Sequence, residues 1–255
     1  MTRTFGLIGY PLTHSFSKKF FTEKFSREGI DAQYKNFEID NIDKLPSIIR
    51  ENPTLEGLNV TIPYKQDIFP YLDEVDEAAK EIGAVNTIQI EREGEKYHLL
   101  GFNTDIIGFG DSIQPLLQSH HTKAMVLGTG GASKAVVWAL EKLGLSTVLV
   151  SRSPQGERQI SYRNLDKNLM EEYTVIVNTT PLGTYPKTEG LPDIPYEFIR
   201  EKHLLYDLVY NPEKTRFLEK GEEQGAAIKN GLEMLHGQAL AAWEIWNRSS
   251  LKISD

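Results

Sequence analysis

A strand-like run that passes through glycines into a helical pattern constrains the fold of this 255-residue chain most. The apolar run ends at Leu127, and Gly128, Gly130 and Gly131 follow before apolar residues return at helical spacing. In such a loop the first glycine permits a tight turn and the second lets a ligand approach the backbone. Free N–H groups at the helix start, here near Ala132, can then hold a pyrophosphate. The pattern predicts a nucleotide site; because the third glycine of the usual motif is replaced by Ser133, a turn made for packing alone is the alternative.

The next apolar run ends in Ser151, Arg152 and Ser153, about 23 residues after Gly128. A site for NAD places an Asp or Glu near this point to accept from the ribose 2′-hydroxyl, and this stretch has none. A guanidinium between two hydroxyls can instead hold a phosphate dianion. The stretch favours NADP over NAD, with an ordinary loop arginine as the alternative.

The first hundred residues alternate between apolar runs and helical patterns. Runs at 4–10, 34–39 and 55–62 are separated by helical patterns at 17–28 and 43–51. Strands separated by helices predict parallel pairing through crossovers. An acidic helical stretch and then two apolar runs flanking Glu93, Gly94 and Glu95 follow, and these two runs predict a hairpin.

The remaining residues predict a second α/β unit. After a helix over 105–117 the pattern restarts, and further strands are expected at 173–180 and 204–210. The final helix, expected over 232–247, carries an apolar stripe typical of core packing: Leu232, Leu235, Ala239, Ala242 and Trp246. Only "PQGE" separates the run ending at Ser153 from the next strand, too few residues for a crossover helix.

Composition narrows the possible partners. A formal net charge of −8 argues against nucleic acid and anionic membranes. The absence of cysteine excludes disulfides and thiolate metal sites and fits a reducing compartment, and no metal is expected. Because no apolar run reaches about 20 residues and no signal peptide is evident, we expect a cytoplasmic protein acting on a small molecule.

Nine segments resemble the shikimate dehydrogenase family in order and spacing. They are "GYPLTHSFS", "EGLNVTIPYK", "IGAVNT", "GFNTDIIG", "LGTGGASKAV", "VSRS", "NTTPLGTYP", "YDLVYNP" and "NGLEMLHGQA". The resemblance implies an enzyme that reversibly reduces 3-dehydroshikimate to shikimate with NADPH, in the route to chorismate and the aromatic amino acids. It further implies an α/β substrate domain of mostly parallel sheet (1–103 plus 238–255) and a Rossmann-like NADP domain (104–237), joined by helices.

The family's functional residues carry over by motif. Lys65 and Asp105 would form the catalytic proton-transfer pair, and Ser15 and Ser17 would bind the substrate carboxylate. Further substrate contacts would come from Asn59, Thr61, Asn86, Tyr210 and Gln238. The cofactor would contact Gly128, Gly130, Gly131, Ala132, Ser151, Arg152, Ser153, Leu208, Gly231 and Met234.

Each assignment has a structural alternative. The serines could be helix caps, Asn86 a turn residue, Asp105 a helix cap and Lys65 a solvated cation in a first helical turn. Met234 could fill the core and Tyr210 could be a buried strand aromatic.

The chain also departs from the family pattern. Leu208 replaces a methionine, Glu233 adds negative charge near the cofactor end, and Gly156 stands where a second basic residue of the phosphate pocket is usual, leaving Arg158 as the nearest candidate. Rival functions are a quinate or quinate/shikimate dehydrogenase, which could use NAD, and a catalytically silent sensor of NADP and a cyclitol acid. We expect the chain to be a monomer or a homodimer. Its sequence does not distinguish between these two states.

Overall fold

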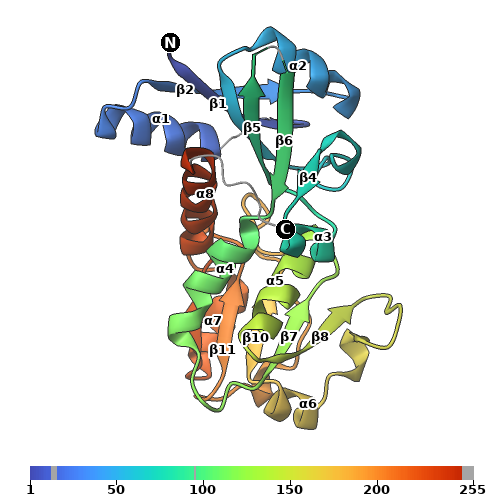
Figure 1. Cartoon of the computed structure of the whole chain (residues 1–255). Coiled ribbons are helices and arrows are strands. Elements are labelled where there is room, and N and C mark those ends of the chain that lie inside the picture. The colour runs from blue at the N-terminus through green and yellow to red at the C-terminus, as the bar shows by residue number, and fades with distance from the viewer. Residues whose placement is uncertain (13–15, 95, 249–255) are drawn as a thin grey trace. The chain divides into compact units, whose positions relative to one another are not determined.

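The computed structural model describes residues 1–12, 16–94 and 96–248, and the chain divides into two compact units. The first unit contains residues 1–104 together with the segment from Ala239 onward. The second unit contains Asp105–Gln238. Both are α/β units, as the alternation of apolar runs and helical patterns predicts (Figure 1).

The first unit is built on a six-stranded sheet of order β2-β1-β3-β5-β6-β4. β1 lies between β2 and β3 and is parallel to both, whereas β5 is antiparallel to β3 and β6. The predicted hairpin is confirmed, because β5 and β6 pair in register around Gly94, with Glu95 outside the described residues. The strands are β1 Arg3–Gly9, β2 Ala32–Glu38, β3 Leu55–Val60, β4 Glu74–Val75, β5 Thr87–Glu93 and β6 Lys96–Phe102.

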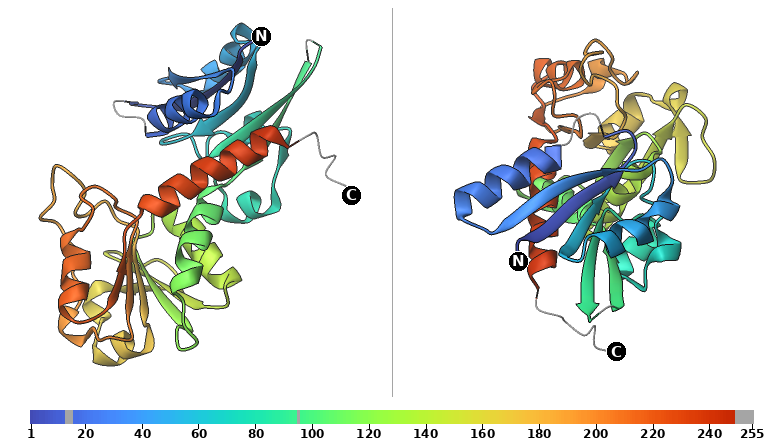
Figure 2. Two further views of the ribbon diagram at one scale, coloured as in Figure 1. Left: turned by 90° about the vertical axis from the view of Figure 1, so that its left-hand side faces the viewer. Right: turned by 90° about the horizontal axis from the view of Figure 1, so that it is seen from above.

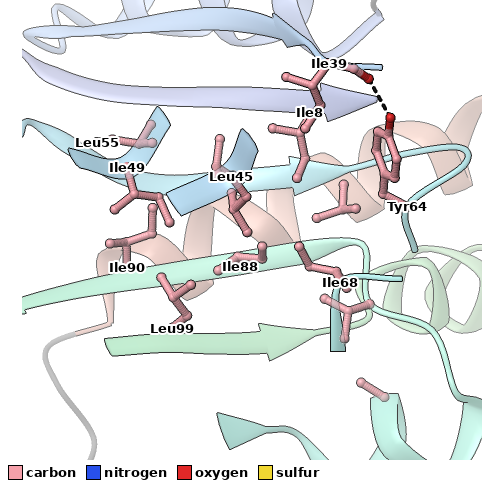
Figure 3. Close-up of a cluster of buried hydrophobic side chains, with 14 residues drawn as sticks. Ile8, Ile39, Leu45, Ile49, Leu55, Tyr64, Ile68, Ile88, Ile90 and Leu99 are labelled. Atoms are coloured by element: carbon pink, nitrogen blue, oxygen red, sulfur yellow. Dashed lines mark hydrogen bonds between the residues drawn. The ribbon is translucent and has the colours of Figure 1, made fainter. Parts of the chain in front are cut away.

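One face of this sheet carries the aliphatic core of the unit. Ile8, Leu58 and Ile88 belong to this cluster and are fully buried. Figure 3 shows Ile8 and Ile88 among its members. Helix α2 (Leu45–Glu51) adds Leu45 and Ile49 to the same cluster. α3 (Glu77–Ile82) and the 3₁₀ turns η1 (Ile42–Lys44) and η2 (Phe69–Tyr71) complete the helical elements described on this part of the chain.

The opposite face is aromatic and carries Phe5, Leu7, Asn59 and Thr87, which alternate with the aliphatic set along their strands. Phe5, Phe21 and Trp246 form one buried cluster on this face. Phe21 comes from α1 (Phe16–Glu28), which runs beside β1 and β2, and Trp246 comes from the end of α8 (Leu232–Asn247) (Figure 2). Two helices therefore cover this face and leave the ends of the strands for polar side chains.

The second unit is a six-stranded parallel sheet of order β12-β11-β10-β7-β8-β9 (Figure 1). Ser112 and Phe109 of α4 meet Tyr206 on one face, while α6 and α7 add Met170 and Phe217 to a cluster on the other. The strands are β7 Lys123–Leu127, β8 Ser146–Ser151, β9 Gln159–Ser161, β10 Val175–Asn178, β11 Leu204–Asp207 and β12 Ala227–Lys229. The helices are α4 Asp105–Ile113, α5 Gly131–Lys142, α6 Lys167–Glu172 and α7 Arg216–Glu223, with 3₁₀ turns η3 Gln114–Leu116, η4 Tyr162–Asn164 and η5 Tyr196–Phe198.

The expected shortening after Ser153 is confirmed. β8 pairs in parallel with β9, with Ser151 opposite Ser161, and no helix lies between the two strands. Parallel neighbours normally need a crossover of a dozen or more residues. The short loop over 152–158 suffices here because β9 is a brief strand at the sheet edge.

Three local expectations were wrong. The first helical turn considered for Lys65 does not form, because residues 62–68 form turns and Pro63 disfavours a regular helix there. α4 ends at Ile113, since Pro115 lies in the following 3₁₀ turn. Leu232 was assigned to a buried stripe but is 43% exposed, because it is the first residue of α8.

Candidate active site

Predicted substrate residues gather at one edge of the first sheet. Asn59 lies near the end of β3, and Thr61 follows the strand with its N–H donating to the Ile8 carbonyl at 2.9 Å. Asn86 immediately precedes β5, and its carbonyl accepts from Val60 N at 2.8 Å. Because β3 and β5 are antiparallel, the end of one strand meets the beginning of the other. This edge therefore brings Asn59, Thr61 and Asn86 together.

Lys65 joins the same edge through its backbone. Its carbonyl accepts from Val85 N at 2.8 Å, one residue before Asn86. The side chain is half-buried, and no helix begins near it. Lys65 is therefore not a freely solvated lysine in a first helical turn.

The amide of Asn86 is oriented by three donors. Its Oδ1 accepts from Thr104 N at 2.7 Å, Thr104 Oγ1 at 3.2 Å and Thr87 Oγ1 at 3.1 Å. A side-chain amide oxygen has two lone pairs, so this oxygen is fully used and the N–H groups remain for a ligand. Asn86 is not a turn residue, because it is 4% exposed and its side chain links two strand ends.

Asn59 is held in a similar way. Its Oδ1 accepts from the Tyr34 hydroxyl at 2.7 Å, and its Nδ2 donates to Thr87 Oγ1 at 3.3 Å. One N–H of the amide is left for another acceptor. Both asparagines are thus oriented to donate, which suits oxygen atoms of a hydroxylated ligand.

Ser17 lies in the first turn of α1, close to Tyr34, whose pKa burial raises and Ser17 lowers. Ser15, its predicted partner in carboxylate binding, lies outside the described residues. The start of a 13-residue helix favours an anion through its unpaired N–H groups and dipole. Ser17 itself is the second helical residue and is therefore not an N-cap.

Three supporting residues at this edge were missed in the sequence. Thr87 and Thr104 directly follow asparagines in "AVNT" and "FNTD", so repeated Asn-Thr pairs at strand ends were an available signal. Tyr34 lies in β2 among ordinary alternating residues and gave no signal.

In the second unit the glycine loop has the features of a phosphate cradle. Gly128 has φ +106°, and a Cβ there would lie 2.9 Å from Thr179 Oγ1, so this position requires glycine. At Gly130 and Gly131 a Cβ would meet nothing within 4 Å. α5 begins at Gly131, and the N–H groups of Gly131 and Ala132 have no acceptor within the helix, whereas Ser133 N donates to Gly130 O at 3.1 Å. The open space and the donors fit a pyrophosphate held by Gly130, Gly131 and Ala132.

The two arginines that follow the loop differ in surroundings. Arg152 is exposed after β8, beside the Ser151 hydroxyl that accepts from Ser153 N at 3.1 Å. Burial raises the pKa of Tyr162, and the nearby Arg152 charge opposes that rise. Arg158 instead donates to Glu141, at the end of α5, and to Thr147 Oγ1 at 2.9 Å. Arg158 is thus paired with Glu141 and Thr147 in this structure, and its contact with a phosphate remains a prediction.

A buried carboxylate supports the neighbouring strand ends. Asp207, at the end of β11, accepts from Asn178 Nδ2 at 2.9 Å, Val209 N at 3.0 Å and Thr215 Oγ1 at 2.5 Å. Burial raises its pKa to about 6, against the lowering effect of these donors. The carboxylate links β10, β11 and the N-cap of α7. The sequence patterns gave no indication of this structural role of Asp207.

The predicted nicotinamide contacts lie around the start of α8. A Cβ on Gly231 would overlap the Leu208 carbonyl, and Gly231 N donates to Val209 O at 3.2 Å. The backbones of Leu208 and Gly231 therefore lie in direct contact with each other. Met234 is buried, so a packing role stays open for it, and Glu233 is paired with Lys229, which offsets its charge.

The other predicted substrate residues of the second unit are more exposed. Tyr210 is 42% exposed and follows β11, so it is not a buried strand aromatic. Gln238 lies in α8 and donates to Leu235 O at 2.9 Å. Asp105 is the first residue of α4 and half-buried, which makes it a helical residue and not the N-cap. Lys65 and Asp105 belong to different units, and their pairing remains a prediction.

Neither a metal cluster nor a membrane helix occurs in the described part of the chain. No group of three or more His, Asp and Glu side chains in it could hold a metal ion. None of its helices combines the length and the apolar character needed to cross a membrane.

Comparison with known proteins identifies the family. Residues 7–88 match the family model described as the shikimate dehydrogenase substrate binding domain. A shikimate dehydrogenase (NADP(+)) from Clostridium beijerinckii is 40% identical over 256 residues, covering 97% of this chain and 93% of that protein.

Solved structures agree with the sequence comparison. A shikimate 5-dehydrogenase from Thermus thermophilus, in complex with NADP(H) and shikimate, is 30% identical with a TM-score of 0.82, covering 96% of this chain and 93% of that one. A quinate dehydrogenase from Corynebacterium glutamicum in complex with NAD is 25% identical with a TM-score of 0.86, covering 96% and 94%. The fold and the site define a two-unit α/β oxidoreductase. The chain belongs to the shikimate dehydrogenase family.

Proposed function

We propose that the first unit binds the substrate and the second unit binds NADP, with the residues at the sheet edge and the glycine loop in the roles assigned above. The chain is an NADP-dependent oxidoreductase that reversibly reduces 3-dehydroshikimate to shikimate, a reaction of aromatic amino-acid biosynthesis. The observation that carries the assignment of roles is the orientation of Asn59 and Asn86, whose oxygens are occupied and whose N–H groups remain to donate.

The substrate residues divide by chemistry. Ser17 and the start of α1 hold the carboxylate, because a serine hydroxyl and helix N–H groups donate to an anion. Asn59 and Asn86 donate to hydroxyl oxygens of the ring. An amide donor discriminates against a ligand that lacks the matching oxygen, because the buried N–H would then be unpaired.

Proton transfer is assigned to Lys65. NADPH, when bound, supplies the hydride that converts the ketone carbon to an alcohol carbon. The ketone oxygen gains negative charge as this happens, and Lys65 Nζ donates a proton to it; in the reverse direction the neutral amine takes the proton back. Asp105 orients the ammonium and accepts a hydrogen bond from a ring hydroxyl. The glycine loop and Arg152 hold the pyrophosphate and the 2′-phosphate, which fixes the cofactor in the second unit.

The test is a turnover assay with shikimate and with quinate, each against NADP and NAD. We expect the highest kcat/KM with shikimate and NADP. A preference for quinate and NAD would assign the chain to the activity named for the Corynebacterium glutamicum relative, and binding without turnover would make it a sensor. Cytoplasmic location and a monomeric or homodimeric state remain predictions, the second of which sedimentation analysis would test.

A further inference from the structure

Tyr34 joins the aromatic face of the first unit to its polar edge. It lies in β2 opposite Phe5 of β1, and its ring stacks on Phe21 of α1 with centroids 4.9 Å apart and planes 10° apart. The residue is 5% exposed. Its hydroxyl reaches past β1, the strand between β2 and β3, to Asn59 of β3.

The hydroxyl is not required by the packing of the ring. Its neighbours Phe5, Phe21, Phe25 and Trp246 are apolar, and phenylalanine would fill the same position. A buried hydroxyl loses its water and is kept only where partners replace it. The burial is deep enough to raise the pKa of Tyr34 well above its usual range, so the group is a neutral phenol with one proton to donate. The hydrogen-bond partners of this hydroxyl therefore indicate why a tyrosine lies at this position.

The residues around the hydroxyl are ones assigned to the substrate. Its proton goes to Asn59 Oδ1, at 2.7 Å, and Ser17 lies close enough to act on the pKa of Tyr34, which burial raises and Ser17 lowers. The bond to Asn59 fixes which way the Asn59 amide faces, since Oδ1 is drawn to Tyr34 and Nδ2 to Thr87.

We propose that Tyr34 is a positioning residue of the substrate site, and that its hydroxyl holds the hydroxyl-binding Asn59 in its ligand-binding orientation, close to the carboxylate-binding Ser17. The proposal rests on the proposed function, because it deepens the roles given there to Ser17 and Asn59. The hydrogen bonds continue from Asn59 through Thr87 Oγ1 to the Asn86 amide, so both substrate asparagines belong to one hydrogen-bonded chain that includes Tyr34.

Removing the hydroxyl should leave the fold and change the site. In Tyr34→Phe the ring still stacks on Phe21, but Asn59 Oδ1 loses its donor and the amide can rotate. A rotated amide would place its oxygen where a ligand oxygen needs a hydrogen-bond donor. We expect the KM and the Kd for shikimate to rise about tenfold, the scale of one hydrogen bond left unmade in a buried site.

The experiment measures Tyr34→Phe by steady-state kinetics, calorimetry and thermal unfolding. The expected result is the tenfold loss for shikimate, kcat within about threefold, and an unchanged Kd for NADP, whose assigned residues lie in the second unit. Tyr206→Phe is the matched control, because Tyr206 is also buried and its hydroxyl hydrogen-bonds Ser112, a residue of the second unit with no assigned substrate role, at 2.7 Å. It should lower stability without raising the KM for shikimate.

A double-mutant cycle separates positioning from general loosening. If Tyr34 acts through Asn59, Tyr34→Phe should add little to the defect of Asn59→Ala. Full additivity, an unchanged KM in Tyr34→Phe, or equal losses for shikimate and NADP would each overturn the proposal. Failure of the proposed function would look different, because Ser17→Ala and Asn59→Ala would then themselves leave shikimate binding unchanged.

Discussion

The indole of Trp246 lies directly against the backbone of Gly57, where a Cβ would overlap Nε1. The same indole N–H donates to the Ile88 carbonyl at 2.9 Å, so α8 is fixed to the middle of the first sheet by one residue. Glycine at position 57 is required by the room that the indole needs, and not by an unusual backbone angle, since Gly57 has no positive φ.

We predict that Gly57→Ala destabilises the protein by about 1 to 3 kcal/mol, because the added methyl forces the indole out of its place in a packed core. The measurement is the thermal unfolding midpoint. Gly110→Ala is the matched control, since a Cβ at Gly110, within α4, meets nothing within 4 Å and alanine is the better helix former. Equal midpoints for Gly57→Ala and the wild-type chain would contradict the packing argument.

The fold was largely predictable because hydrophobic periodicity reports which face of an element is buried. The α/β class, the hairpin around Gly94 and the missing helix after Ser153 followed from run lengths and spacing. The contact between Gly57 and Trp246 could not be predicted, since it joins residues far apart in sequence and depends on how α8 lies on the sheet. The turns after Val60 contain Pro63, which disfavours a regular helix at this point and is the signal in the sequence for a turn.

The candidate site was predictable only where a motif names its residues. Asn59 and Asn86 were found from their segments, whereas Tyr34 and Asp207 act through partners on other strands. Such support depends on which strands become neighbours, and strand order is a property of the sheet. Arg158 shows the converse, because its sequence position suggested a phosphate contact, whereas in the structure its guanidinium is paired with Glu141.

For the cofactor we predict that Arg152→Ala raises the KM for NADP about tenfold and leaves that for NAD nearly unchanged, since only NADP carries the 2′-phosphate. Arg158→Ala removes the same charge but should leave the KM for NADP nearly as it is, because that guanidinium is engaged by Glu141 and Thr147. Steady-state kinetics with both cofactors gives the comparison. Equal losses with NADP and NAD in Arg152→Ala would show that the residue is structural.

For catalysis we predict that Lys65→Ala lowers kcat by roughly 10²- to 10⁴-fold, the usual contribution of a general acid or base, with a much smaller change in KM for shikimate. Lys80→Ala, which removes an exposed lysine of α3, should leave both constants unchanged. Single-turnover kinetics would confirm that the chemical step is the slowed one. If KM rises and kcat survives within a few-fold, Lys65 binds substrate and the proton travels by another route, through Asp105 and water.

The buried Asp207 gives a prediction about pH. Its folded-state pKa is raised from 3.8 to about 6 by burial, so the folded chain binds this proton more tightly than the unfolded chain does. The stability contributed by this group is therefore present at low pH and is lost as the pH rises from about 4 to about 6, with no further change above that range.

Asp207→Asn removes the titration and keeps the shape of the side chain. We expect the variant to gain stability relative to the wild-type chain as the pH rises through this window, by at most about 3 kcal/mol for a shift of about two pKa units. Hydrogen exchange of the β10 and β11 amides at several pH values measures the difference locally, which avoids assuming that the two units unfold together. Asp111→Asn removes an exposed carboxylate of α4 and should show no such window. A difference that stays constant with pH, or that falls as the pH rises, would mean that the donors from Asn178, Val209 and Thr215 outweigh burial and that Asp207 is ionised throughout.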